Sequence, residues 1–86
     1  MSIMKALTVY KPDEDLLKVI AHEFKSLRIK RGMTIEELSG ICGLHEKYLQ
    51  TIERNHRNIS ISVFVQIAKA LNISPSKLLE KALRAK

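Results

Sequence analysis

The sequence lacks both the cysteines of a disulfide framework and the long apolar run of a membrane span. Of its 86 residues one is cysteine, three are glycine, two are proline and none is tryptophan. Because Cys42 is the single cysteine, an internal disulfide framework is excluded, and this fits a reducing compartment. No apolar run approaches the roughly 20 residues that cross a bilayer, and the apolar start is too short for a signal peptide. We therefore expect a cytoplasmic protein without a membrane partner.

Residues for catalysis and metal binding are equally sparse. His22, His45 and His56 have no ligand spacing with Cys42, so no metal site is expected. The three glycines form no phosphate-cradling loop, and no Ser–His–acid combination has local support. We expect no cofactor, and we expect that the protein is not an enzyme.

What the sequence has is positive charge. Fifteen Lys and Arg residues against nine Asp and Glu give a net charge of +6. A small basic domain suits phosphate backbones or anionic membranes, although charge alone can also serve solubility. The length corresponds to one domain, and domains this small are only marginally stable, so oligomers are common.

Helical signals follow an arm of uncertain structure, residues 1–11. Pro12 and three acids predict a helix start, and Gly32 predicts its end. Between them the apolar residues recur with helical spacing; they are Leu16, Leu17, Ile20, Phe24 and Leu27.

Two short helices are expected next. The run from Thr34 to Glu37 is a capping box, so a helix should begin at Ile35 and extend to about residue 41. Gly43 permits a sharp turn, after which a helix should run from about His45 to residue 54. Asn55 can adopt a positive φ at its end.

Two more helices complete the all-α prediction of five helices and no sheet. Ser60 and Ser62 are candidate caps for a helix through Leu71, and Ser74 with Pro75 opens another to about residue 83. The functional unit is the helix–turn–helix from 34 to 53. A turn this short makes the helices cross steeply, so the second projects, and its width fits the DNA major groove.

The sequence here resembles the Cro and phage-repressor (XRE-type) helix-turn-helix family. The resemblance covers about residues 24–79 and rests on Arg28–Thr34, Glu36–Leu38, Gly43-Leu44, Ile52–Arg54, Ile67–Leu71 and Leu78-Leu79. Within the family, Gly43–His45 and Ile52–Ser60 resemble controller proteins of restriction–modification systems. The resemblance implies a five-helix repressor-like domain, residues 12–86, that binds double-stranded DNA.

The resemblance also implies residue roles. Arg28 and Glu53 match a buried ion pair that ties the first helix to the recognition helix. The matching DNA-facing positions are Glu46, Lys47, Gln50 and Thr51 on the helix and Arg54 and Arg57 after it. Departures from the family are Ile35 where a phosphate-contacting Gln is usual, Ser39 for alanine, His45 for a Ser or Thr cap, and the acidic Glu46.

Several of the DNA-facing residues also have a simpler interpretation. Glu46 can accept from a cytosine amine or merely stabilise the start of the helix dipole. Lys47 is either a DNA contact or a solvated lysine, and the Tyr48 hydroxyl either reaches a phosphate or the ring packs at the helix edge. For Arg54 and Arg57 we expect contact with DNA phosphates; the alternative is that they are solvated side chains of a loop. Weaker candidates are Lys25, Lys30 and Arg31.

The last predicted helix has an apolar face formed by Leu78, Leu79, Ala82 and Leu83. We assign Leu78 to the core and predict that Leu79, Ala82 and Leu83 form a homodimer interface. The alternatives are that this helix packs on the first helix, or that the arm covers it. Cys42 is interpreted as a small buried hydrophobic residue.

These features predict a homodimeric transcription regulator that binds a palindromic operator and blocks or recruits RNA polymerase. If the controller resemblance holds, it regulates its own gene and an endonuclease gene. An antitoxin or a lysogeny repressor is an alternative with the same chemistry. A protein-binding adaptor that has lost DNA contact is the alternative from another class.

Overall fold

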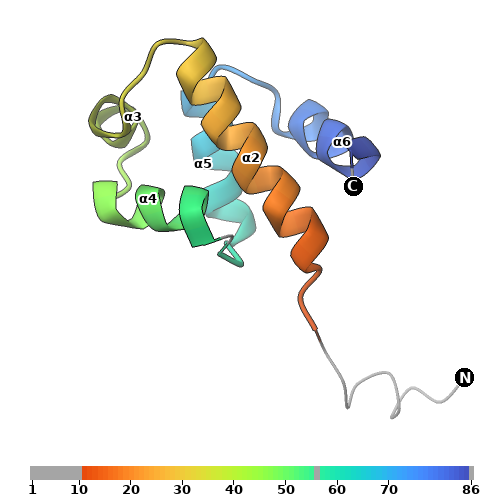
Figure 1. Cartoon of the computed structure of the whole chain (residues 1–86). Coiled ribbons are helices and arrows are strands. Elements are labelled where there is room, and N and C mark those ends of the chain that lie inside the picture. The colour runs from red at the N-terminus through yellow and green to blue at the C-terminus, as the bar shows by residue number, and fades with distance from the viewer. Residues whose placement is uncertain (1–10, 56, 86) are drawn as a thin grey trace, which may run out of the picture.

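The computed structural model describes residues 11–55 and 57–85, and these form five helices without a strand. They are α2 (Glu14–Lys30), α3 (Ile35–Cys42), α4 (Glu46–Asn55), α5 (Ile61–Ala70) and α6 (Pro75–Ala85). Figure 1 shows α3 and α4 together on one side of the long helix α2 and α6 on the other side. Within the described part of the chain no helix is long and apolar enough to span a bilayer. The predicted arm lies, except for Lys11, outside the described residues.

Helix α2 starts two residues later than Pro12 because Asp13 serves as its cap. The Asp13 carboxylate accepts a hydrogen bond from the Leu16 N–H at 3.1 Å. The helix ends at Lys30, and Gly32 follows with a φ of +67°, a conformation in which a residue with a side chain would be strained. There the N–H groups of Gly32 and Met33 donate to carbonyls of the last turn, which satisfies orphan acceptors.

Helix α3 begins with the predicted capping box. The Glu37 N–H donates to the Thr34 hydroxyl at 3.0 Å, and the Thr34 N–H donates to the Glu37 carboxylate at 2.9 Å. The helix ends at Gly43 with φ +76°. The Ser39 hydroxyl then donates to the Leu44 carbonyl, which fixes the turn from α3 to α4. This bond holds the two helices at their crossing.

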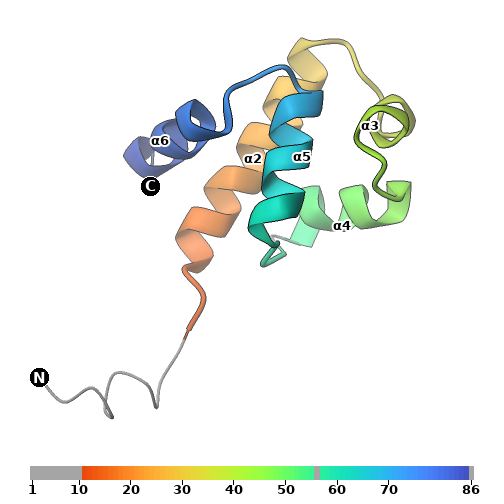
Figure 2. The ribbon, with the colours of Figure 1, turned by 180° about the vertical axis from the view of Figure 1, so that it is seen from behind.

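One core joins all five helices. Seven large side chains are fully buried: Phe24, Leu38, Leu49, Ile52, Ile67, Leu71 and Leu78. Figure 2, the view from behind, shows α5 in front of α2, between α3 and α6. Phe64 on α5 contacts Phe24 on α2, with 5.8 Å between the ring centroids. Cys42 is only half-buried at the edge of this core, so the prediction of a buried thiol is wrong.

The predicted positive φ lies at a different asparagine. Asn55 belongs to α4 and is helical, whereas Asn72 after α5 has φ +57° and is the one non-glycine residue of 11–55 and 57–85 in that region. The N–H groups of Asn72 and Ile73 donate to the carbonyls of Lys69 and Ala68. This arrangement ends α5 and turns the chain toward α6.

Candidate nucleic-acid interface

Helix α4 lies at the edge of the molecule with one face in the core and one in solvent. Leu49 and Ile52 are 2% and 1% exposed. Among residues 46–54 of this helix, the exposed charged or amide side chains are Glu46, Lys47, Gln50 and Arg54. An isolated helix with an outward polar face can enter a DNA major groove.

The start of α4 is capped by an imidazole. The His45 Nδ1 accepts a hydrogen bond from the Lys47 N–H at 3.1 Å. The histidine thus supplies a cap acceptor at the position where the family usually has Ser or Thr.

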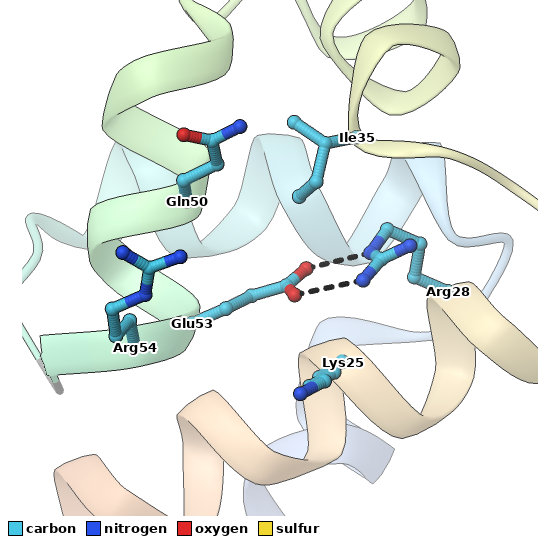
Figure 3. A pocket seen from close by; sticks show the side chains of 6 residues that line it. All are labelled: Lys25, Arg28, Ile35, Gln50, Glu53 and Arg54. Atoms are coloured by element: carbon cyan, nitrogen blue, oxygen red, sulfur yellow. Dashed lines mark hydrogen bonds and ion pairs between the residues drawn. The ribbon is translucent and has the colours of Figure 1, made fainter.

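An ion pair fixes α4 on α2. The Arg28 guanidinium donates through Nε and Nη2 to the two Glu53 carboxylate oxygens at 2.8 and 3.0 Å (Figure 3). Its Nη1 donates to the Met33 carbonyl at 2.8 Å. The hydrogen bond to Glu53 raises the pKa of Arg28, although burial opposes the rise. Since the side chains are 13% and 10% exposed, this fork is mostly withdrawn from water and sets the orientation of α4.

The other predicted DNA-facing residues differ in availability. Tyr48 is half-buried and its ring packs against the core. The Thr51 hydroxyl donates to the Lys47 carbonyl at 2.8 Å, so its proton is already used within the helix. Arg57 is exposed in the segment after α4. DNA contact by any of these residues stays a prediction.

The predicted dimer residues do not share one environment. On α6, Leu79 and Leu83 are 39% and 52% exposed, whereas Ala82 is 0% exposed. Ala82 is a core residue because α6 packs against α2, so its assignment to a dimer interface is wrong. The exposed apolar face of α6 is therefore Leu79 and Leu83.

The sequence reasoning missed Glu23, a buried acid on α2. Glu23 is 9% exposed, and its carboxylate lies 3.4 Å from the Lys81 ammonium on α6. Helical spacing could have found it, since it lies three residues after Ile20 and four before Leu27, on the apolar face. A charge within such a stripe indicates a partner on the neighbouring helix.

Comparison with known proteins agrees with this geometry. The family described as helix-turn-helix matches residues 24–78. Control protein C.SmaI of Serratia marcescens is 37% identical over 67 residues, covering 78% of this chain and 80% of that protein. The crystal structure of the restriction-modification controller protein C.AhdI from Aeromonas hydrophila is 32% identical, with a TM-score of 0.67 over 72% of this chain and 94% of that one.

A second solved structure contains DNA. It is the controller protein C.Esp1396I tetramer in complex with its natural 35 base-pair operator, at 33% identity and a TM-score of 0.73. The superposition covers 80% of this chain and 92% of that one. The similar region thus includes the helix pair and most of the surrounding bundle.

Proposed function

Since this chain belongs to the helix-turn-helix family and resembles, within it, the restriction–modification controller proteins, we propose that it is a sequence-specific DNA-binding transcription regulator. The observation that carries the proposal is the outward face of α4, held in place by the Arg28–Glu53 fork. The family is one of DNA-binding regulators, and the chain's own role is that of a regulator, not an enzyme. A DNA target puts its action in the cytoplasm.

In this proposal α4 lies in the major groove, and the residues at its start face base edges. Lys47 and Gln50 are exposed donors for bases or phosphates, and Glu46 is an acceptor for the cytosine amine. Arg54 and Arg57, at the end of the helix and beyond, contact phosphates and fix its position on the duplex. Tyr48 and Thr51 contribute less, since the ring packs on the core and the hydroxyl is internally bonded.

We further propose a homodimer joined through α6. Leu79 and Leu83 are exposed apolar side chains four residues apart on one helix face. Self-association of this face would cover them and relate two copies by a two-fold axis. Two recognition helices would then meet the half-sites of a palindromic operator. Restriction–modification genes are the proposed targets, with the chain's own gene among them and RNA polymerase as the machinery affected.

Binding to DNA tests the first part of this proposal. We expect the wild-type protein to select a palindrome from random sequences and to lose affinity steeply with salt. Arg57→Ala should weaken binding to selected and random DNA alike and lower the log–log salt slope by about one unit. Lys77→Ala on α6 is the control and should leave both unchanged. Wild-type protein that binds no DNA at low salt refutes regulation through DNA and favours the adaptor.

Sedimentation tests the dimer. Leu79→Glu combined with Leu83→Glu should give a folded monomer with much weaker operator binding, because two charges would enter the apolar contact. Ile41→Glu is the matched control, since Ile41 is also an exposed aliphatic residue, at 59%, but lies on α3. A double variant that remains a dimer contradicts the assignment to α6.

A further inference from the structure

A hollow of about 300 Å³ lies beside α4, where three helices meet (Figure 3). Its walls come from α2, the first residue of α3, and α4. The six lining residues are Lys25, Arg28, Ile35, Gln50, Glu53 and Arg54. Lys25 and Arg28 line it together because they are three residues apart on α2 and so share a face.

The hollow is electropositive. Three of its residues are cationic and one is acidic, which gives it a net charge of +2. The Glu53 carboxylate is engaged on both oxygens by Arg28. Neither Lys25 nor Arg54 has an ion pair with any other described residue, so these two charges are not neutralised within the part of the chain that the structure covers. These two charges give the hollow a positive potential that attracts an anion.

The polar donors come from two sides only. Gln50 and Arg54, one turn apart on α4, bring an amide and a guanidinium to one side, and Lys25 brings an ammonium from α2 (Figure 3). Ile35 closes the third side with a side chain that has no donor. An anion held here would therefore be shared between α2 and α4.

We propose that this hollow binds one phosphate of the DNA backbone, with Lys25 as the contact from α2. The inference rests on the proposed function. Gln50 and Arg54 belong both to the hollow and to the exposed face of α4, so a duplex lying on that face brings its backbone to the hollow's mouth. Phosphate contacts of this kind fix register without reading sequence. Lys25 thus becomes part of the interface, although it lies outside the helix–turn–helix.

The test compares two lysines on the same helix. Lys25→Ala removes the charge in the hollow, and Lys18→Ala removes another exposed charge of α2 that does not line it. Lys25→Ala should reduce the log–log salt slope of DNA binding by about 0.9 and should weaken binding to selected and random DNA alike. Lys18→Ala should have the affinity and the salt slope of the wild type. Backbone phosphates can also be replaced one at a time by uncharged methylphosphonates. At one position this replacement should lower the DNA affinity of the wild type but not that of Lys25→Ala.

Two results would overturn the proposal. One is equal salt slopes for the Lys25 and Lys18 variants when the wild type binds DNA. The other is thermal stabilisation by inorganic phosphate, against chloride at the same ionic strength, that disappears in Lys25→Ala without any change in DNA binding; the hollow would then hold a free anion. Failure of the wild type to bind DNA at all rejects the proposed function instead, so the two failures are distinct.

Discussion

Glu23 on α2 and Lys81 on α6 form an ion pair with 3.4 Å between the ammonium nitrogen and a carboxylate oxygen. The burial of the pair is unequal, since the acid side chain is 11% exposed and the lysine side chain 60%. An exposed pair contributes little to stability. Here, however, the carboxylate lies largely out of water, so the lysine matters mainly because Glu23 needs a partner.

This asymmetry predicts how the pair responds to substitution. Lys81→Ala should lower the free energy of unfolding by about 1–2 kcal/mol, because it strands a mostly buried acceptor. Lys77→Ala, an exposed lysine on the same helix, should change it by less than about 0.5 kcal/mol. Glu23→Met combined with Lys81→Met should recover most of the loss, since no charge is then stranded. Urea titrations measure all three, and equal effects of the two single changes would contradict the prediction.

Substitution of Glu53 should be costlier. Glu53→Gln keeps the shape but leaves the Arg28 charge without its counterion at a site that is little exposed, at a cost of about 3 kcal/mol. The surface pair of Glu80 and Arg84 supplies the control, since Glu80→Gln should cost about 1 kcal/mol or less. Thermal melts check this, because about 1 kcal/mol corresponds to roughly 4–8 °C in a domain of this size. A Glu53→Gln melt within a degree of wild type would rule it out.

The imidazole cap of α4 predicts a graded series at position 45. His45→Ala removes the acceptor for the Lys47 N–H and should destabilise the protein by about 1 kcal/mol. His45→Ser and His45→Asp supply other acceptors and should match or exceed the wild type. Melting temperatures rank the four proteins, and an alanine variant as stable as the serine variant would show that the cap contributes nothing.

The capping box of α3 predicts a pH dependence. Hydrogen bonds from the Thr34 backbone and side chain lower the pKa of Glu37 below its ordinary value. A lowered folded-state pKa gives stability that is present above the unfolded pKa, roughly 4.3, and is lost as pH falls through the folded value. Glu37→Gln should remove this part of the acid sensitivity while leaving the capping geometry at neutral pH. Melts of both proteins from pH 7 to pH 3 measure it, and parallel curves would disprove it.

Glu46 predicts a change of sequence preference. If its carboxylate accepts from cytosine, Glu46→Gln should alter the preferred base at one symmetric pair of operator positions, by about 1–3 kcal/mol. Glu36→Gln, an exposed acid in the first turn of α3, is the control and should leave the preference unchanged. Selection from random sites gives the answer. If Glu46→Gln and the wild type select the same consensus, Glu46 does not read a base, and its role is limited to stabilising the start of α4 through the helix dipole.

Local sequence rules were enough to predict the helices of this protein, because their caps are local. The capping box at Thr34 and the glycine turn at Gly43 depend on residues that are neighbours in the chain. The environment of Ala82 could not be predicted in this way. Helical spacing places Ala82, Leu79 and Leu83 on nearby parts of α6, but only the packing of α6 on α2 decides which of them is covered.

The candidate site likewise has one part that could be predicted from spacing within a helix and one part that depends on packing between helices. The exposure of Glu46 and Lys47 follows from the apolar spacing of Leu49 and Ile52 on α4. The hollow at Lys25 depends instead on the approach of α2 to α4, which spans 25 residues of sequence between Arg28 and Glu53. No pattern within a single helix contains that information.

The separation of functions within α4 bears on how such a protein diversifies. Glu46, Lys47 and Gln50 are exposed and contribute no side chain to the core, whereas Leu49, Ile52 and Glu53 hold the helix in place. Mutations at the first three positions therefore cost little stability. A lineage can drift at these positions, acquire a different operator and keep the same folded scaffold throughout.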